Sequence, residues 1–246
     1  MSVSKTTLLS FMATMMISPV ASANSFNDTE KQELENIFED YLMNNPKVIM
    51  KSLDKFQVDQ RAEAEQNRKK ALEDNYEDII NTPDMPFAGN PNGDIVVMEF
   101  SDYNCGYCKK ALPDVINLID KDKNVKVLFV EFPILGPSSM EYAQYALAAS
   151  LQGQYFEYHQ RLMESKGPRE KKTAINIAKD MGLDIERLEK DAKSSEVNKM
   201  IQSNRQLAAK LSLTGTPAFV VDKEVIGGYI PLSSMEEIIA KARENK

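Results

Sequence analysis

The two cysteines of this 246-residue chain, Cys105 and Cys108, are separated by only two residues. A disulfide between them would close too short a loop to restrain the unfolded chain, whereas structural disulfides gain most from closing long loops. The same spacing suits thiol–disulfide exchange, in which one thiolate attacks a disulfide and a neighbouring thiol resolves the mixed disulfide. We therefore interpret the pair as reactive rather than structural.

The surrounding pattern assigns the two thiols different roles. An apolar run from Ile95 to Phe100 predicts a buried strand, and a helix is expected from about Cys105 to Lys121. A thiol at the start of a helix faces unpaired backbone N–H groups and the positive end of the helix dipole, and both favour the thiolate. Cys105 is accordingly the candidate nucleophile, and Cys108, one turn further along, is the candidate resolving cysteine.

A metal site is the main alternative use of these thiols. A tetrahedral zinc site needs four ligands, and the chain offers two cysteines and one histidine, His159, so we expect no zinc site within one chain. Two thiolates can hold copper(I), and the 13 methionines keep a copper(I)-binding thiol protein open as an alternative. We otherwise expect no metal and no cofactor. His159 lies on a predicted helix and is interpreted as a helix-surface or partly buried residue without a catalytic role.

The first residues resemble an export signal. Lys5 precedes an apolar stretch from about Leu8 to Ile17, and the small residues Ala21-Ser22-Ala23 follow, so a signal peptide over residues 1–23 is expected, with cleavage before Asn24. No later apolar run approaches the roughly 20 residues that a membrane-spanning helix requires. The formal net charge of −7, without a basic run, argues against nucleic acid as a partner. We therefore expect a periplasmic protein.

The next segment carries apolar residues at helical spacing. One stripe runs from Asp28 to Asn44, and Asn45 is expected to cap a second helix that begins at Pro46. The polar stretch from Asp59 to Asp74 predicts a solvated helix or a linker. The segment is too small to bury its own stripes, so we expect it to hold two or three chains together, a dimer in preference to a trimer. The apolar residues are Leu34, Ile37, Phe38, Tyr41, Leu42, Val48, Ile49, Leu53 and Phe56.

The rest of the sequence, from about residue 82 onward, predicts an α/β domain. Turn residues punctuate positions 82–93, and a second strand is expected at Val125–Phe132, which with the first strand and the intervening helix makes a strand–helix–strand crossover. Helices are predicted over about 138–211, with an Ala-rich stripe. A hairpin at 218–226 and a final helix at about 233–244 complete the order.

Three motifs, in the same order, resemble the DsbA family of the thioredoxin superfamily: Glu99–Lys110 around the cysteines, Phe132–Gly136, and Thr214–Ala218. The resemblance spans roughly residues 94–246. Within the family the chain is closest to the ScsC-like and Com1-like oligomeric members, because Asp40-Tyr41-Leu42 and Asn45-Pro46 resemble their N-terminal segment. The resemblance implies a thioredoxin fold with an inserted helical domain, preceded by a helical oligomerisation segment. The expected domains are the signal peptide (1–23), the oligomerisation segment and linker (24–75), and a catalytic domain (76–246) with its insert at about 138–211.

The resemblance also implies roles for three further residues. Glu99 corresponds to a buried acid that exchanges a proton with the second cysteine, and its four apolar neighbours favour burial and a raised pKa. Pro217 corresponds to the family's cis-proline beside the disulfide, although by itself it reads as an ordinary turn proline. Thr216 would then pair its backbone with an extended client peptide.

Gly106 and Tyr107 stand where DsbA itself has Pro-His, and we count both in the client-binding surface. Tyr107 carries no charge at neutral pH, so a strongly oxidising pair is not expected. The expected function is a disulfide isomerase or reductase of exported proteins, with oxidation as an additional direction, served by an oxidising or reducing membrane redox partner. A dedicated disulfide oxidase is the alternative within the enzyme class, and the reduction potential would order these activities.

Overall fold

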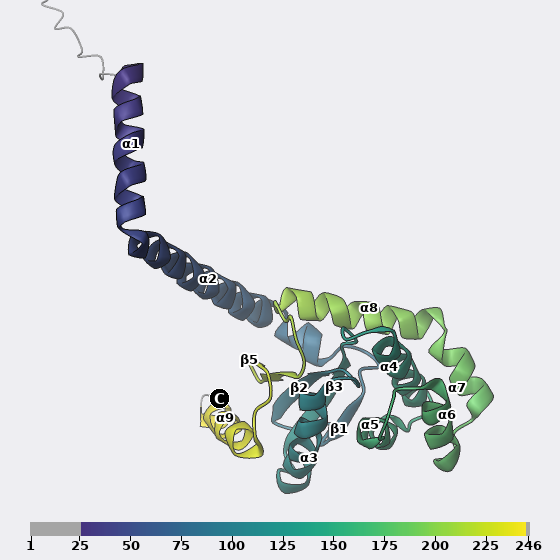
Figure 1. Ribbon diagram of the computed structural model, residues 1–246. Helices are drawn as coiled ribbons and strands as arrows, with labels where there is room; N and C mark the ends of the chain where they lie inside the picture. The colour runs from purple at the N-terminus through teal and green to yellow at the C-terminus, as the bar shows by residue number, and fades with distance from the viewer. Residues whose placement is uncertain (1–25, 245–246) are drawn as a thin grey trace, which may run out of the picture. The chain divides into compact units, whose positions relative to one another are not determined.

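The computed structural model describes residues 26–244, so the expected signal peptide over residues 1–23 and its cleavage before Asn24 lie outside the described residues (Figure 1). The chain divides between Val58 and Asp59 into two compact units, each of which is described by itself. The helices are α1 (Asp28–Asn44), α2 (Pro46–Ile80), α3 (Gly106–Lys121), α4 (Pro137–Ser150), α5 (Tyr155–Glu164), α6 (Lys171–Asp180), α7 (Ile185–Ala192), α8 (Ser195–Lys210) and α9 (Leu232–Glu244). The strands are β1 (Phe87–Gly89), β2 (Ile95–Ser101), β3 (Val125–Glu131), β4 (Ala218–Val221) and β5 (Glu224–Gly227).

The first unit holds α1 and the beginning of α2. A capping box starts α1, because Asn27 Oδ1 accepts the Glu30 N–H at 3.0 Å and the Glu30 carboxylate accepts the Asn27 N–H at 2.8 Å. Asn45 ends α1 and Pro46 opens α2, at the position where a missing N–H costs a helix nothing. Both helices begin where the sequence predicts.

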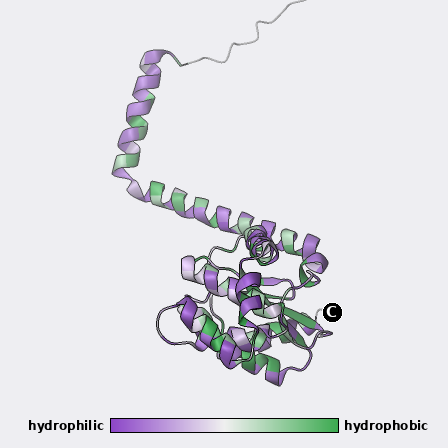
Figure 2. Ribbon diagram, turned by 90° about the vertical axis from the view of Figure 1, so that its right-hand side faces the viewer, coloured by the Kyte–Doolittle hydropathy of each residue, from purple (hydrophilic) through white to green (hydrophobic). Residues whose placement is uncertain are grey.

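No residue of α1 is buried. Large apolar side chains are exposed from Phe26 through α1 to the start of α2. In Figure 2, which colours the ribbon by hydropathy, green bands mark hydrophobic residues on both helices. The exposed large apolar residues are Phe26, Ile37, Phe38, Tyr41, Leu42, Met43, Val48, Ile49, Met50, Leu53, Phe56 and Val58. We call these twelve residues the N-terminal apolar face.

In the second unit, the polar stretch predicted as a solvated helix or linker continues α2 without interruption to Ile80. The last turns of α2 bury Leu72, Tyr76 and Ile79 in the core beneath the sheet. The Tyr76 hydroxyl also donates to the Asp222 carboxylate at 3.1 Å. This part of α2 therefore belongs to the catalytic fold.

The sheet has the order β1-β3-β2-β4-β5, with β2 and β3 parallel and the other neighbours antiparallel. The sequence predicts turns over residues 82–93, and this prediction is wrong for β1, which is an edge strand. Only three residues pair there, from Phe87 opposite Leu128 to Gly89 opposite Lys126, and Pro86 precedes them. So short a strand shows no alternation, and only its pairing with β3 makes it a strand.

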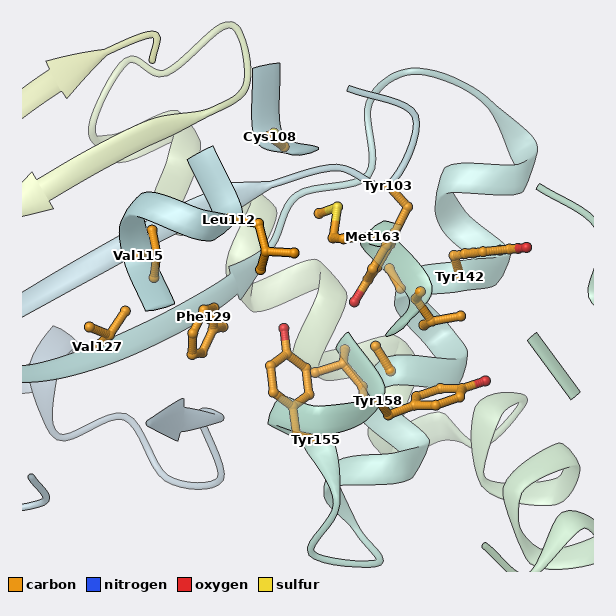
Figure 3. Close-up of a cluster of buried hydrophobic side chains, with 14 of the residues drawn as sticks. Tyr103, Cys108, Leu112, Val115, Val127, Phe129, Tyr142, Tyr155, Tyr158 and Met163 are labelled. Atoms are coloured by element: carbon orange, nitrogen blue, oxygen red, sulfur yellow. The ribbon is translucent and has the colours of Figure 1, made fainter. Parts of the chain in front are cut away.

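Two apolar cores lie on opposite faces of this sheet, because successive residues of a strand point to opposite sides. One face contributes Ile95, Val97, Val127 and Phe129 to the core that contains α3, α5 and α9, part of which Figure 3 shows. The other face contributes alternate residues such as Met98 to the core with α2 and α8. The inserted helices α4 to α8 follow β3, and the predicted hairpin and final helix occur as β4, β5 and α9. The thioredoxin-like fold with a helical insert is confirmed.

Candidate active site

Both cysteines are free thiols at the start of α3. Cys105 is the N-cap residue, with extended backbone, and its Sγ accepts the backbone N–H of Cys108 at 3.4 Å. Cys105 is 6% exposed, whereas Cys108 is 0% exposed. The helix start thus presents one sulfur to its unpaired N–H groups and encloses the other.

Burial raises the pKa of the Cys108 thiol well above its ordinary range, and the neighbouring Cys105 and Glu99 raise it further. A thiol in this environment stays protonated at neutral pH. For Cys108 to act as a nucleophile, a nearby group must therefore accept its proton at the moment of attack.

The loop before β4 completes the surroundings of Cys105. The Cys105 thiol lies 3.1 Å from the carbonyl oxygen of Thr216, to which it donates, and the Thr216–Pro217 bond is cis. The structure thereby places the two residues singled out from the third sequence motif directly beside the first cysteine. The Thr216 backbone thus lies beside the Cys105 sulfur.

Two clefts meet beside this loop and share Leu213. The larger, about 540 Å³, is mostly apolar and includes most of the second sequence motif; the smaller, about 320 Å³, is formed largely by the loop around Pro217. The larger is lined by Phe132, Pro133, Ile134, Gly136, Arg205, Ala209 and Leu213. The fold thus brings the second and third motifs to one surface.

Asp102 is a structural residue of this site that the sequence reasoning did not single out. Its buried carboxylate accepts the backbone N–H groups of Asn104, Ile134 and Leu135 at 2.7, 2.8 and 2.9 Å. It also accepts the Ser139 hydroxyl at 2.6 Å. One carboxylate therefore ties the redox loop to the Phe132–Gly136 motif. A charged residue directly after an apolar strand and before the cysteine motif was the available signal.

Glu99 lies in the middle of β2, 1% exposed. Burial raises the pKa of its carboxyl to about 7; Glu131 raises it as a like charge, and His159 lowers it. An acid with this pKa can take and release a proton near neutral pH. Glu99 also raises the pKa of the Cys108 thiol, so the protonation of the two groups is coupled.

Of the other residues discussed in the sequence analysis, Gly106 and Tyr107 lie at the surface and His159 is buried. Gly106 has open space where a side chain would begin, and the Tyr107 side chain is 63% exposed, so both lie at the surface beside Cys105. His159 differs from the expectation, because it is fully buried and contacts Tyr103 and Glu131. The helix that carries His159 packs against the sheet, which its sequence alone did not show.

Within residues 26–244, no group of three or more His, Cys, Asp or Glu side chains is arranged to hold a metal ion. Nor does that part of the chain contain a helix long and apolar enough to cross a membrane. The described site combines two thiols, a buried acid and the Thr216–Pro217 loop.

Comparison with known proteins yields solved structures of the same fold. A thioredoxin-like oxidoreductase from Silicibacter pomeroyi DSS-3 is 41% identical, with a TM-score of 0.65, and the match covers 67% of this chain and 95% of that chain. A linker-deletion mutant of Proteus mirabilis ScsC is 22% identical, with a TM-score of 0.68, and the match covers 92% of this chain and 100% of that one. The second likeness is one of fold.

Among curated proteins, Disulfide bond formation protein D of Bacillus subtilis (strain 168) is 23% identical over 178 residues, 66% of this chain and 78% of that protein. Na(+)/H(+) antiporter NhaA 1 of Mycobacterium sp. (strain KMS) is 29% identical over 140 residues, 54% of this chain. The match spans only 23% of the length of that antiporter.

Two family descriptions match the chain. Residues 30–63 match the N-terminal domain of ScsC, described as a copper resistance protein. Residues 96–240, more than half of the chain, match the DSBA-like thioredoxin domain. With its two free thiols at the start of α3 and the Thr216–Pro217 loop beside them, the chain belongs to the DsbA-like family of thiol–disulfide oxidoreductases.

Proposed function

We propose that this protein is a periplasmic disulfide isomerase and reductase of exported proteins, and that it works as a homo-oligomer. The observation that carries the proposal is the combination, in one chain, of a two-thiol redox site with the N-terminal apolar face. The first supplies the chemistry. The second supplies a means of presenting more than one redox site to the same client.

The reaction begins when the Cys105 thiolate attacks one sulfur of a client disulfide, which forms a mixed disulfide and releases a client thiolate. In isomerisation, a client thiolate then attacks the mixed disulfide, so that Cys105 is regenerated and no net electrons move. In reduction, the Cys108 thiol loses its proton and attacks Cys105. The protein then holds the Cys105–Cys108 disulfide and the client has gained two electrons, which a reducing membrane partner must restore.

The surface around Cys105 supports a peptide client. The Thr216 backbone lies beside the sulfur, and the apolar cleft of about 540 Å³ adjoins the same loop. The side chains of Tyr107, Ile134 and Leu135 are exposed. An unfolded client exposes apolar side chains and unpaired backbone together, and this surface suits both.

The N-terminal apolar face supports self-association. It contains twelve of the sixteen exposed large apolar residues identified among the described residues. A soluble monomer seldom exposes so many large apolar side chains on one helical segment, and pairing identical segments across a symmetry axis would bury them. The match of residues 30–63 to the ScsC N-terminal domain agrees with this reading. We propose two or three chains, a dimer in preference to a trimer.

The proposed location rests on the export signal predicted for residues 1–23. The proposed direction of thiol–disulfide exchange, isomerisation and reduction in preference to oxidation, rests on two features. Gly106 and Tyr107 provide no positive charge to stabilise the Cys105 thiolate, so a strongly oxidising pair is not favoured. Several clefts in one assembly could also hold a misfolded client while its disulfides rearrange.

A test compares the mature protein with the double variant Phe38→Glu, Leu53→Glu, which places charges in the N-terminal apolar face. The matched control, Glu39→Lys with Asp54→Lys, changes charge at the neighbouring positions. Sedimentation, insulin reduction and refolding of scrambled ribonuclease are measured for all three. We expect the wild type and the control to be oligomers with both activities, and the double variant to be a monomer that keeps insulin reduction and loses isomerase activity. A wild-type protein that is monomeric at micromolar concentration would refute the oligomer.

Two alternatives have distinct outcomes in the same measurements. A dedicated oxidase would oxidise reduced ribonuclease rapidly, would show a high reduction potential and would not rescue the scrambled enzyme. A copper(I)-binding thiol protein, favoured by the ScsC match over residues 30–63 and by the two free thiols, would bind one copper(I) tightly and reduce no insulin.

A further inference from the structure

A cluster of polar side chains is buried beneath the redox loop, apart from the cysteines. Its members come from β2, β3, α5 and the loop before α3, and each is at most 5% exposed. They are Glu99, Glu131, His159, Tyr155 and Tyr103. Figure 3 shows the hydroxyl groups of Tyr103 and Tyr155 directed toward the same region, below Cys108.

Short hydrogen bonds connect four of these residues. The hydroxyls of Tyr103 and Tyr155 both donate to Oε1 of Glu131, at 2.8 and 2.6 Å. The Tyr103 oxygen also lies 2.8 Å from Nδ1 of His159. Because a tyrosine hydroxyl has one proton, Tyr103 donates that proton to Glu131 and accepts from the N–H of His159. The order of donation is therefore from His159 through Tyr103 to Glu131.

The surroundings of His159 exclude water and compensate charge. The Tyr155 ring stacks on the imidazole at 5.4 Å and 19°, and the Phe129 ring lies 5.1 Å away. Nδ1 of His159 is 3.8 Å from Oε1 of Glu131. A lone charge in such a site would be very costly, and the Glu131 carboxylate is compensated by the two hydroxyl groups that donate to it and by the nearby imidazole.

The β2–β3 register brings Glu99 next to this pair. Glu99 lies opposite Phe129, and Ser101 lies opposite Glu131, so the two glutamates are diagonal neighbours on one face of the sheet. His159 lowers the pKa of Glu99 and Glu131 raises it. The two residues therefore shift the pKa of Glu99 in opposite directions.

The titratable groups that act on Glu99, or on which it acts, are Glu131 on β3, His159 and Tyr155 on α5, and Cys108 on α3. Tyr103, in the loop before α3, and Tyr142, Tyr145 and Tyr158 belong to the same core. The neighbouring β4 residue Phe219 and the α9 residues Met235 and Ile239 are apolar. Arg169 binds the Tyr103 carbonyl oxygen at 3.0 Å and fixes that loop.

We propose that His159 and Glu131 are positioning residues that set how readily the Glu99 carboxylate accepts the Cys108 proton. The inference rests on the thiol exchange proposed above. In the resolving step the proton moves from Cys108 Sγ to Glu99, the Cys108 thiolate attacks Cys105 Sγ, and the client sulfur leaves as a thiolate. The two residues thereby determine the pH range in which the mixed disulfide is resolved.

The test uses substitutions with opposite expected effects on the pKa of Glu99, in the full-length mature protein. His159→Gln removes the group that lowers this pKa and leaves Glu131, so Glu99 should hold its proton more tightly. Glu131→Gln removes the group that raises it, so Glu99 should hold its proton less tightly. The measured quantity is the rate at which a preformed Cys105–glutathione mixed disulfide is resolved, from pH 5 to pH 9.

We expect the midpoint of the acidic limb of the rate profile to occur at a higher pH for His159→Gln than for Glu131→Gln. The expected difference is about one pH unit, which corresponds to a tenfold change in the proton affinity of Glu99. Acidic limbs at the same pH in the two variants would overturn the proposal, because damage to a purely structural cluster would shift both profiles alike. Limbs in the reverse order would overturn it as well. His159→Phe keeps the aromatic volume and should shift the limb upward from the wild type if His159→Gln does not fold.

Two controls separate this outcome from general repacking. Tyr158→Phe removes a buried hydroxyl on the same helix, bonded to the Ala174 carbonyl oxygen at 2.9 Å, and should leave the limb in place. In a Glu99→Gln background, His159→Gln should cause no further shift. Carboxyl ¹³C NMR titration of Glu99 in the same variants requires no turnover, so it tests the inference even if the wild type proves inactive in exchange and the proposed function fails.

Discussion

The sulfur of Cys105 lies 3.1 Å from the carbonyl oxygen of Thr216, although the two residues are 111 positions apart in the sequence. This contact joins the start of α3 to the loop before β4. A client strand paired with the Thr216 backbone would therefore pass beside the sulfur that attacks it. Four predictions concern this site and the residues that support it.

The two thiols should differ in reactivity. Cys108 is fully buried and its pKa is raised, whereas Cys105 caps α3 and contacts Thr216, which lines the smaller cleft. Brief alkylation of the reduced protein at pH 6 should label Cys105 on the order of tenfold faster than Cys108. Peptide mass spectrometry measures the ratio, and unfolded protein, in which the difference should vanish, is the control. Faster labelling of Cys108 would reverse the assignment of nucleophile and resolving thiol.

The dipeptide between the cysteines should influence the reduction potential. Gly106 is the first residue of α3 with open space around it, and Tyr107 is exposed, so Pro and His can replace them without repacking. A histidine cation beside Cys105 would stabilise the thiolate and so the reduced form. We expect a rise of at most several tens of millivolts, where about 30 mV equals 1.4 kcal/mol.

Glutathione equilibration measures this potential, and Tyr107→Phe serves as the matched control because it changes the same exposed position without adding charge. An unchanged potential in the Gly106→Pro, Tyr107→His variant would mean that the dipeptide does not control the redox pair.

Glu99→Gln should change how stability depends on pH. The carboxyl has a pKa of about 7 in the folded protein and an ordinary value of 4.5. Between these values the folded state binds more protons than the unfolded chain, so the free energy of unfolding falls as the pH rises from about 4.5 to about 7. Glutamine does not titrate, so the variant should gain stability relative to the wild type across this window, by at most about 3 kcal/mol.

Urea unfolding at pH 4.5 and pH 8 measures that difference. Glu164→Gln, at an exposed position, should show the same offset at both pH values. An equal offset for Glu99→Gln at the two pH values would contradict the raised pKa.

Asp102→Ala should destabilise the protein and impair exchange together. The substitution leaves three backbone N–H donors and the Ser139 hydroxyl without their acceptor. We expect a loss of about 3 to 5 kcal/mol in the free energy of unfolding, since each buried unpaired donor costs about 1 to 3 kcal/mol and the loop can relax in part. Asp102→Asn, which keeps one acceptor oxygen, should lie between the wild type and the alanine variant. Wild-type stability in Asp102→Ala would show that the loop does not depend on this carboxylate.

Much of the fold follows from local patterns. Alternating or continuous apolar runs predict β2, β3 and the hairpin, and helical stripes with caps predict α1, the start of α2, α3 and α9. These elements are specified by interactions among residues close in sequence, or by the periodicity of a buried face. The sequence did not predict β1, because a three-residue edge strand has no hydrophobic pattern of its own and forms only through its pairing with β3.

The chemistry of the site divides in the same way. The sequence by itself determined the reactive pair and its helix, because Cys105, Cys108 and the capping geometry lie within a few residues of each other. Only the tertiary structure decided what surrounds that pair. His159 looked like a surface residue and Glu131 like the end of a strand, since hydrophobic periodicity describes one element at a time. Their pairing through Tyr103 depends on the packing of α5 against the sheet, where buried polar groups must find partners from distant parts of the chain.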